Sequence, residues 1–116
     1  NAKEEIEILD QIIKSDLKEF CIPLNNLNIS KIIPIIKNCN VAICNDSSFS
    51  HLSAALNIPT IVLMTDTPLV YGSYSSHMHP ILPEGTDTVS HDTLGRDKIN
   101  PSEIQKKLEE ILLRVS

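Results

Sequence analysis

The chain has 116 residues, which is enough for one small domain and too few for a complete two-domain enzyme. Hydrophobic residues account for 41% of it and charged residues for 22%, a composition that argues against an intrinsically disordered chain. Ten basic residues against fifteen acidic ones give a net charge of −5, which argues against nucleic acid as a partner.

The sequence also bears on location. No apolar run is long enough to form a transmembrane segment, and the first residues do not have the pattern of a signal peptide. The three cysteines, Cys21, Cys39 and Cys44, form no Cys-x-x-Cys pair, which is typical of reduced thiols. We therefore expect a cytoplasmic protein.

The first third of the chain predicts helices that alternate with strands. Isoleucine and leucine recur at helical spacing over residues 3–19, with charged residues on the other face. Residues 20–22 form a short apolar run ended by a proline, which predicts a buried strand. A short helix over 29–38 follows, with Ser30 as its expected N-cap. The four apolar residues 41–44 are typical of a fully buried parallel strand.

The middle of the chain continues this alternation. Residues 45–50 predict a polar turn, and the following helix over 50–56 ends at Asn57. Residues 60–64 are mostly apolar and predict a second buried strand.

The last part of the chain lacks periodicity until its final helix. Residues 65–97 contain scattered prolines and glycines and one candidate strand near 78–82. A loop of this length in a small domain is often functional. Asn100 then supplies a helix cap and Pro101 the first helical position, and the apolar positions of this helix continue to Val115.

The order of elements predicts the fold class. It is α/β, a Rossmann-like parallel sheet flanked by helices, and we expect a single domain over residues 1–116. In such sheets ligands bind beyond the carboxyl ends of the strands. Residues 45–51 and 64–74 follow buried strands, so we expect the chemistry in these two segments.

The charge distribution limits how either segment could hold an anion. No Lys or Arg stands between Lys37 and Arg96. A phosphate bound there must rely on backbone N–H groups, hydroxyls, histidine or a helix dipole. Aromatic residues make up only 3% of the chain, so no base-stacking surface is expected.

The first segment is suited to an anion because it combines a hydroxyl-rich turn with a helix start. The first turn of a helix presents unpaired N–H groups and the positive end of its dipole. Ser47, Ser48 and Ser50 add hydroxyl donors, and His51 could direct a ring N–H to the same anion. Asp46 better suits a capping role or contact with sugar hydroxyls, because a carboxylate accepts hydrogen bonds. A capped helix start with a packed histidine is the simpler alternative.

The same segment resembles glycosyltransferase family 9, the lipopolysaccharide heptosyltransferase-like enzymes. The family pattern is a strand, then D-S-G-x-x-H-L-A-A-A-L-x-x-P, then another strand. The matching positions here are Asp46, Ser47, His51, Leu52, Ala54, Ala55, Leu56 and Pro59. Residues 65–68 and 71–74 also resemble the family's G-P-T-D-P and (W/Y)-G-P-Y loop. The resemblance covers roughly residues 1–82 and, less specifically, the final helix.

The resemblance implies a GT-B architecture, in which two Rossmann-like halves enclose the substrate cleft. The carboxyl-terminal half binds the nucleotide-sugar donor, and this chain would be most of that half, without its first strand. The reaction implied is metal-independent transfer of the sugar, with inversion and without a cofactor, to a lipopolysaccharide or other saccharide acceptor. The catalytic base would lie in the other half. The full-length enzyme would be cytoplasmic or peripheral to the inner membrane.

The resemblance also implies a set of donor-binding residues. They are Asp46, Ser47, Ser48, Phe49, His51, Thr65 and Asp66. Two of them depart from the family pattern, since Ser48 replaces a glycine and Phe49 a small residue. Glycine permits a close backbone approach or a positive φ, which serine tolerates less well. These two positions therefore bear on which donor is bound and how tightly.

Other classes of protein fit fewer of the residues. Nucleotide-sugar 2-epimerases share the GT-B fold but resemble D-S-G-G-x-x-E-E, with acids where His51 stands. A non-catalytic Rossmann-like nucleotide- or phosphate-binding module is an alternative function. A receiver domain, which has about this size, should show an acidic pair after its first strand and a lysine after its last, and neither is found here. A Ser-His-Asp hydrolase would need a G-x-S-x-G turn. Zinc is disfavoured because His77 and His79, with His91 nearby, have no third ligand at a convincing spacing.

Overall fold

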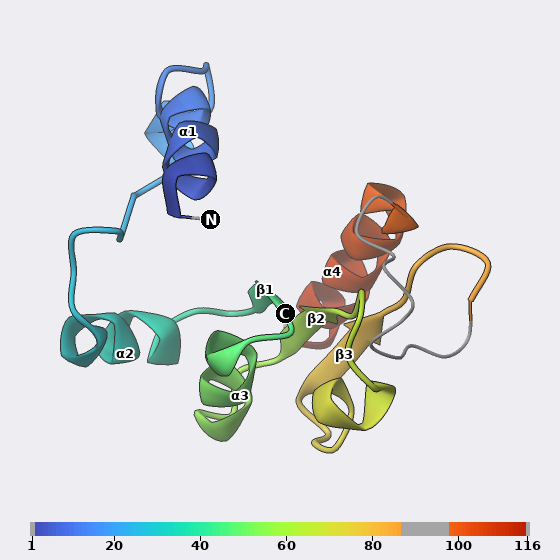
Figure 1. Ribbon diagram of the computed structural model, residues 1–116. Helices are drawn as coiled ribbons and strands as arrows, with labels where there is room; N and C mark the ends of the chain where they lie inside the picture. Colours follow the sequence, from blue (N-terminus) through green and yellow to red (C-terminus); the bar gives the residue numbers. More distant parts are fainter. Residues whose placement is uncertain (1, 87–97, 116) are drawn as a thin grey trace. The chain divides into compact units, whose positions relative to one another are not determined.

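The computed structural model describes residues 2–86 and 98–115 (Figure 1). These residues form two compact units, Asn1–Ile32 and Ile33–Ser116, and each is described by itself. The second unit contains the sheet, and the observed order of helices and parallel strands confirms the α/β class.

The first unit is helical. It contains α1 (Ala2–Ile13), η1 (Lys18–Phe20) and the start of α2 (Ile29–Lys37). The helix predicted over 3–19 therefore ends earlier, and Ser15 explains why. Its hydroxyl donates to the carbonyl of Ile12 at 2.6 Å and accepts from the Leu17 amide at 3.1 Å. Serine hydroxyls that bond locally to the backbone offer it an alternative to the helical ladder.

The strand predicted over residues 20–22 is wrong. Phe20 ends η1 with 78% of its surface exposed, Ile22 is 84% exposed, and Cys21 is exposed as well. The described strands pair only with one another, so this run has no partner in the described part of the chain. An apolar run cannot become a strand without a neighbour for its backbone groups, and Pro23 removes one donor beyond it.

Helix α2 forms where it was predicted but with a different cap. The Asn28 side-chain oxygen accepts from the Lys31 amide at 3.2 Å and from the Ser30 hydroxyl at 2.6 Å. Asn28 therefore caps the helix, and Ser30 lies inside it. Asparagine is at least as good a cap as serine, which explains why the cap lies two positions before the predicted one.

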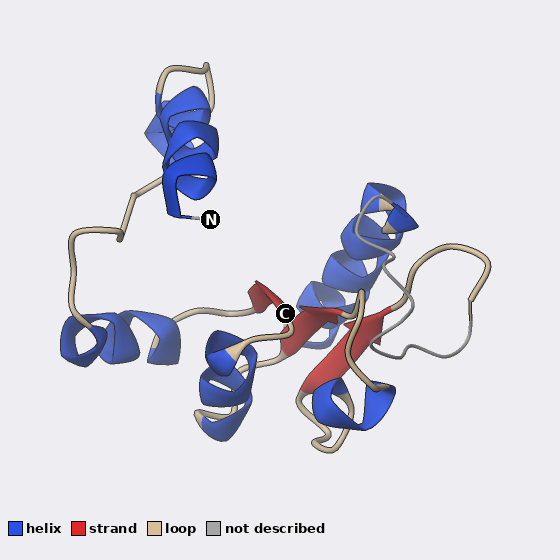
Figure 2. Ribbon diagram, in the orientation of Figure 1, coloured by secondary structure: helices blue, strands red, loops and turns tan. Residues whose placement is uncertain are grey.

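Three parallel strands form the sheet of the second unit: β1 (Ala42–Asn45), β2 (Thr60–Leu63) and β3 (Met78–Ile81), red in Figure 2. Their order is β1-β2-β3, with Ile43 opposite Ile61 and Ile61 opposite His79. Helix α3 (Ser48–Ala55) packs on β1 and β2, and α4 (Pro101–Val115) packs on β2 and β3.

The central strand β2 carries both cores of the sheet. Val62 packs with Ala54 of α3 and with Met64 and Met78, whereas Ile61 packs with Ile81 and with Ile111 of α4. Successive side chains of a strand point to opposite faces, so the two clusters lie on the two sides of the sheet. This confirms the predicted helices on both faces and explains why Thr60, Ile61 and Val62 of β2 are all buried.

Strand β1 is less buried than predicted. Its burial alternates, and Ile43 is 47% exposed. Ile43 shares a face with Ile61, but α4 packs on that face mainly over β2 and β3. The prediction of a fully buried strand was wrong because β1 is an edge strand that one helix covers on one side.

Two predicted helix ends of the second unit are confirmed, at Asn57 and Asn100, whereas α3 begins at Ser48 and not at residue 50 because Ser47 is its N-cap. Asn57 closes α3 with a φ of 64°, a left-handed conformation that asparagine tolerates. Asn100 accepts from the Ser102 amide at 2.9 Å, and Pro101 is the first residue of α4. Within residues 65–86 the predicted loop contains η2 (Leu69–Gly72) and the candidate strand, observed as β3. The rest of that loop, residues 87–97, lies outside the described residues.

Two absences concern only the described residues. None of their helices has the length and apolar composition needed to cross a lipid bilayer. They also contain no group of three His, Cys, Asp or Glu side chains placed to hold a metal ion. His91, which was weighed as a zinc ligand, lies outside the described residues.

Candidate functional site

A depression of about 460 Å³ lies at the carboxyl ends of β1 and β2. It is lined by Asn45, Asp46, Leu63, Thr65, Asp66 and Ile99. Three predicted site residues, Asp46, Thr65 and Asp66, therefore meet here although they follow different strands. The Thr65 hydroxyl donates to an Asp66 carboxylate oxygen at 3.3 Å. The position agrees with the rule that open parallel sheets bind ligands beyond their carboxyl ends.

Helix α3 begins beside this depression. Ser47 is its N-cap in an extended conformation, and Ser48 is its first residue. The Ser50 hydroxyl accepts from the Ser47 amide at 3.4 Å and donates to the Ser47 carbonyl at 2.7 Å. Ser50 is fully buried, so it closes the turn and cannot serve as the ligand donor that the sequence suggested.

The other predicted residues of this turn are accessible. Ser47 and Ser48 are exposed, and Phe49 is 44% exposed at the second position of α3. None of the three lines the depression, so the structure places them at the adjoining helix start. Ser48 has no positive φ, because among described non-glycine residues only Asn57 has one. A serine in place of the family's glycine is thus compatible with the backbone.

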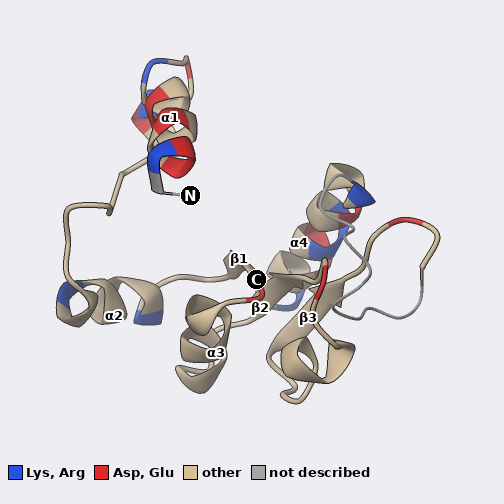
Figure 3. Ribbon diagram, viewed as in Figure 1, with Lys and Arg blue, Asp and Glu red and all other residues tan. Residues whose placement is uncertain are grey.

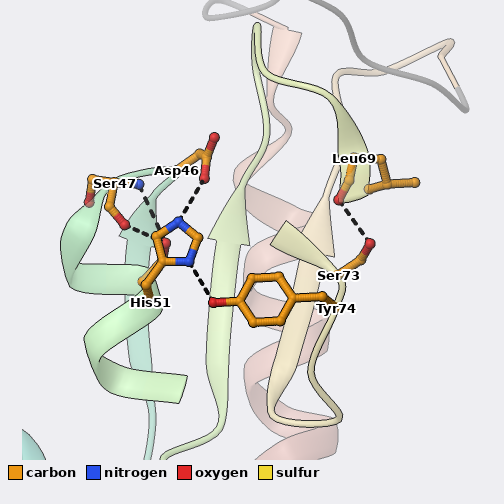
Figure 4. Close-up of polar contacts among 7 residues, drawn as sticks. Asp46, Ser47, His51, Leu69, Ser73 and Tyr74 are labelled. Carbon is orange, nitrogen blue, oxygen red and sulfur yellow. Dashed lines mark hydrogen bonds and ion pairs between the residues drawn. The ribbon is translucent and has the colours of Figure 1, made fainter. Parts of the chain in front are cut away.

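His51 lies one turn into α3 and has a partner at each ring nitrogen (Figure 4). Its Nε2 is 4.0 Å from Oδ1 of Asp46, which is ion-pair distance and too long for a direct hydrogen bond. Its Nδ1 is 2.6 Å from the hydroxyl of Tyr74. The two rings are nearly parallel, at an angle of 11° with centroids 5.6 Å apart. His51 thereby links the strand end at Asp46 to the loop at Tyr74.

Tyr74 was not among the predicted site residues. It ends the 64–74 segment that follows a buried strand, and it belongs to the Tyr-Gly-Ser-Tyr segment that the resemblance covers. Its contact with His51 spans 23 positions of sequence, which no periodicity reveals. The structure thus adds Tyr74 to the site and supports a role for the loop that contains it.

The turn before Tyr74 is held by two local features. The Ser73 hydroxyl donates to the Leu69 carbonyl at 2.8 Å. Gly72 is buried against Met64, and a Cβ at this position would overlap the Met64 sulfur and press on Val62. A glycine is therefore required for the close approach of this turn to the sheet. Packing in the core and the position of Tyr74 are coupled in this way.

The electrostatics of the site follow from its composition. Figure 3 shows no Lys or Arg on α3 or on the three strands. Asp46 and Asp66 contribute the carboxylates that line the depression. Carboxylates accept hydrogen bonds from hydroxyls, whereas the start of α3 offers N–H groups to an anion. The arrangement can therefore hold a ligand that has both an anionic and a hydroxyl-rich part.

Cys44 lies on β1 behind this site. Partial burial raises the pKa of its thiol, and a hydrogen bond with Ser53 of α3 opposes that shift. The thiol is therefore protonated near neutral pH. It serves the contact between α3 and β1 rather than the chemistry of the site.

Comparison with known proteins identifies the family of this chain. The family model for glycosyltransferase family 9 (heptosyltransferase) matches residues 1–86, which include Asp46, His51 and Tyr74. The chain is also similar to lipooligosaccharide heptosyltransferase 2 of Haemophilus influenzae, with 35% identity over 74 residues. That match covers 61% of this chain and 21% of the relative, so the chain spans about a fifth of the relative's length. No solved structure matches it. Because the family model covers most of its length, the chain belongs to glycosyltransferase family 9.

Proposed function

We propose that this chain is the part of a heptosyltransferase-like glycosyltransferase that binds the nucleotide-sugar donor. The observation that carries the proposal is the joining of Asp46 and His51 at the carboxyl edge of the sheet. These residues match the family pattern. Asp46 lines the depression, and His51 lies in α3, whose start is exposed beside it. A nucleotide sugar has a diphosphate and a hydroxyl-rich sugar, which are the two chemical groups that these features suit.

The proposed role of the helix start is to hold the diphosphate. The N–H groups at the first turn of α3 and the accessible hydroxyls of Ser47 and Ser48 would donate to its oxygens. The same donors would stabilise the negative charge that develops when the diphosphate departs. His51 would add a ring N–H, which compensates in part for the lack of Lys and Arg between Lys37 and Arg96.

The proposed role of the carboxylates is to orient the sugar. Asp46 and Asp66 would accept hydrogen bonds from sugar hydroxyls in the depression that they line. Holding the anomeric carbon in one orientation lowers the entropic cost of transfer. We propose that the catalytic base lies outside these 116 residues, and that the reaction proceeds with inversion and without a metal ion. The acceptor would be lipopolysaccharide or another envelope glycan, reached in the cytoplasm or at the inner membrane.

Titration calorimetry tests this assignment. ADP, UDP and GDP, and the glucose conjugate of each, are titrated into the wild type, His51→Ala and Asp46→Ala. We expect His51→Ala to weaken the binding of the free nucleoside diphosphate and of its glucose conjugate equally, because it removes a hydrogen-bond donor to the diphosphate that both contain. Asp46→Ala should weaken the conjugate more than the free diphosphate, because it removes an acceptor for the sugar. The preferred base would identify the class of donor.

His77→Ala is the matched control. His77 lies at the opposite end of the sheet, where its carbonyl accepts from the Thr60 amide at 2.7 Å. Its removal should leave all affinities unchanged, and circular dichroism checks that each variant is folded. If a folded wild type binds none of the six compounds, or if His77→Ala is as damaging as His51→Ala, the proposed function is wrong.

A further inference from the structure

The hydrogen bond between Tyr74 and His51 has no place in the function proposed above. At 2.6 Å between Tyr74 Oη and His51 Nδ1 it is short, and it joins two side chains that are otherwise accessible. His51 is 43% exposed and Tyr74 is 60% exposed. An exposed imidazole without partners samples several orientations and both neutral tautomers. A defined partner at one nitrogen restricts both.

The second ring nitrogen determines the direction of this bond. Nε2 faces the Asp46 carboxylate, which can only accept hydrogen bonds when it is ionised. A proton on Nε2 is therefore favoured and a bare Nε2 beside the carboxylate is disfavoured. In the neutral ring Nδ1 is then without a proton and accepts from the Tyr74 hydroxyl.

We propose that Tyr74 is a positioning residue that holds His51 as the neutral tautomer with its proton on Nε2. The Tyr74 hydroxyl donates to Nδ1, and the Nε2 proton is directed to the edge of the sheet where Asp46 lies. That this N–H donates to the diphosphate rests on the proposed function. The tautomer is assigned independently of that function, because it follows from the two contacts of the ring.

The surrounding loop allows the hydroxyl to be tested alone. Tyr74 follows the turn that Ser73 closes on Leu69 and that Gly72 packs on Met64. Tyr74→Phe leaves these contacts and the near-parallel arrangement of the rings in place, and it removes only the donor to Nδ1. Tyr71→Phe is the matched control. Tyr71 lies in the same segment and is 53% exposed, and its hydroxyl has no partner within the described ranges.

Nitrogen NMR of histidine gives a direct readout of the tautomer. Long-range proton–nitrogen spectra of the chain are recorded at a pH where the imidazoles are neutral, and His51 is assigned through His51→Ala. In the wild type we expect Nδ1 to have the shift of an unprotonated nitrogen and Nε2 that of a protonated one. In Tyr74→Phe both shifts should move toward those of an averaged mixture, whereas Tyr71→Phe should match the wild type.

Binding provides a second readout in the form of a double-mutant cycle. Affinities for ADP, UDP and GDP are measured on the wild type, Tyr74→Phe, His51→Ala and the double variant. Loss of one positioned hydrogen bond should weaken diphosphate binding roughly three- to tenfold in Tyr74→Phe. The same change should have no further effect when His51 is already alanine, because Tyr74 acts through that ring.

The two readouts separate failure of this proposal from failure of the proposed function. A protonated Nδ1 in the wild type, or shifts that are the same in Tyr74→Phe and the wild type, overturns the role of Tyr74 whatever the binding data show. The role of Tyr74 is also overturned if Tyr74→Phe weakens diphosphate binding as much in the His51→Ala background as it does in the wild type. Wild-type protein that has the expected tautomer but binds no nucleoside diphosphate supports the positioning role and contradicts the donor-binding function.

Discussion

The two compact units of this chain are both rich in amphipathic helix, yet only one of them has a buried core. The buried hydrophobic residues in the described part of the chain all lie within Ile33–Ser116. Helix α4 buries Ile111 to 3% exposure against the sheet, whereas α1 leaves Ile6 at 50% and Ile8 at 58%. The apolar periodicity predicted both helices, although α1 ends at Ile13 and not at residue 19. Apolar periodicity predicts which face of a helix is apolar, but it does not predict which element covers that face.

Truncation of one isoleucine in each unit should give the largest difference. Ile61→Ala removes a fully buried side chain from the central strand and should lower the free energy of unfolding by about 2–5 kcal/mol. Ile6→Ala truncates a half-exposed side chain and should change it by less than about 0.5 kcal/mol. Urea unfolding followed by circular dichroism measures both.

This pair of variants can break the comparison outright. Equal losses from Ile61→Ala and Ile6→Ala would mean that the face of α1 is covered in solution and that the second unit has no special core. If the first unit unfolds at a lower urea concentration than the second, the difference between the two units is larger than burial alone indicates. The second unit would then unfold in a separate transition.

A smaller effect is expected where the core meets the site. Gly72→Ala places a methyl group against the Met64 sulfur in a fully packed region and should cost about 1–3 kcal/mol. Because the severe overlap is with Met64 and the contact with Val62 is milder, most of the cost should disappear in a Met64→Ala background. Thermal unfolding of the four proteins of this cycle measures the coupling. Purely additive losses would show that Gly72 is needed for some reason other than room beside Met64.

Much of the second unit could be predicted from sequence because its signals are local. The Asn57 helix end, the Asn100 cap and the apolar run of β2 each depend on residues close in the chain. The strand ends predicted the edge of the sheet where Asp46, Thr65 and Asp66 meet, and the role of these residues in donor binding stays a prediction.

What could not be predicted depends on tertiary partners. Phe20 and Ile43 have the same apolar character as buried residues, but no described element covers them. The sequence suggests that Ser50 is an accessible donor, but its hydroxyl is hydrogen-bonded to the backbone of Ser47 at the helix start. The contact of Tyr74 with His51 depends on how the loop after β2 returns to α3, which no local pattern specifies.

The packing of α4 on the sheet should also produce a dependence of stability on pH. Burial lowers the pKa of His79 on β3, and the positive charges of Lys107, Arg114 and His77 lower it further, against the opposing effect of Glu110. The folded protein therefore binds the proton less readily than the unfolded chain does. Stability is complete above the ordinary histidine pKa of 6.5 and falls as the pH drops from there through the folded pKa.

The pH dependence of stability that His79 causes is limited, because this side chain binds at most one proton. The slope should stay below about 1.4 kcal/mol per pH unit, the value for a full proton difference. Urea unfolding at several pH values between about 8 and about 5 measures it, with His79→Gln for comparison. The difference between the wild type and His79→Gln should grow as the pH falls. If the two curves stay parallel, His79 is not a source of the pH dependence.

The smallest expected effect is a difference in reaction rate between two cysteines, one in each unit. Cys21 is exposed in the first unit, whereas Cys44 lies between β1 and α3 with its thiol pKa raised by burial. Thiolate is the reactive form, so Cys44 should react with a disulfide reagent about tenfold more slowly than Cys21. Cys39 is exposed as well, and replacing it with serine leaves two thiols with separable rates. Two equal, fast rates would mean that α3 opens from β1 readily. The helix that carries His51 would then be held less firmly than its packing indicates, and the orientation of that histidine would depend mainly on Tyr74.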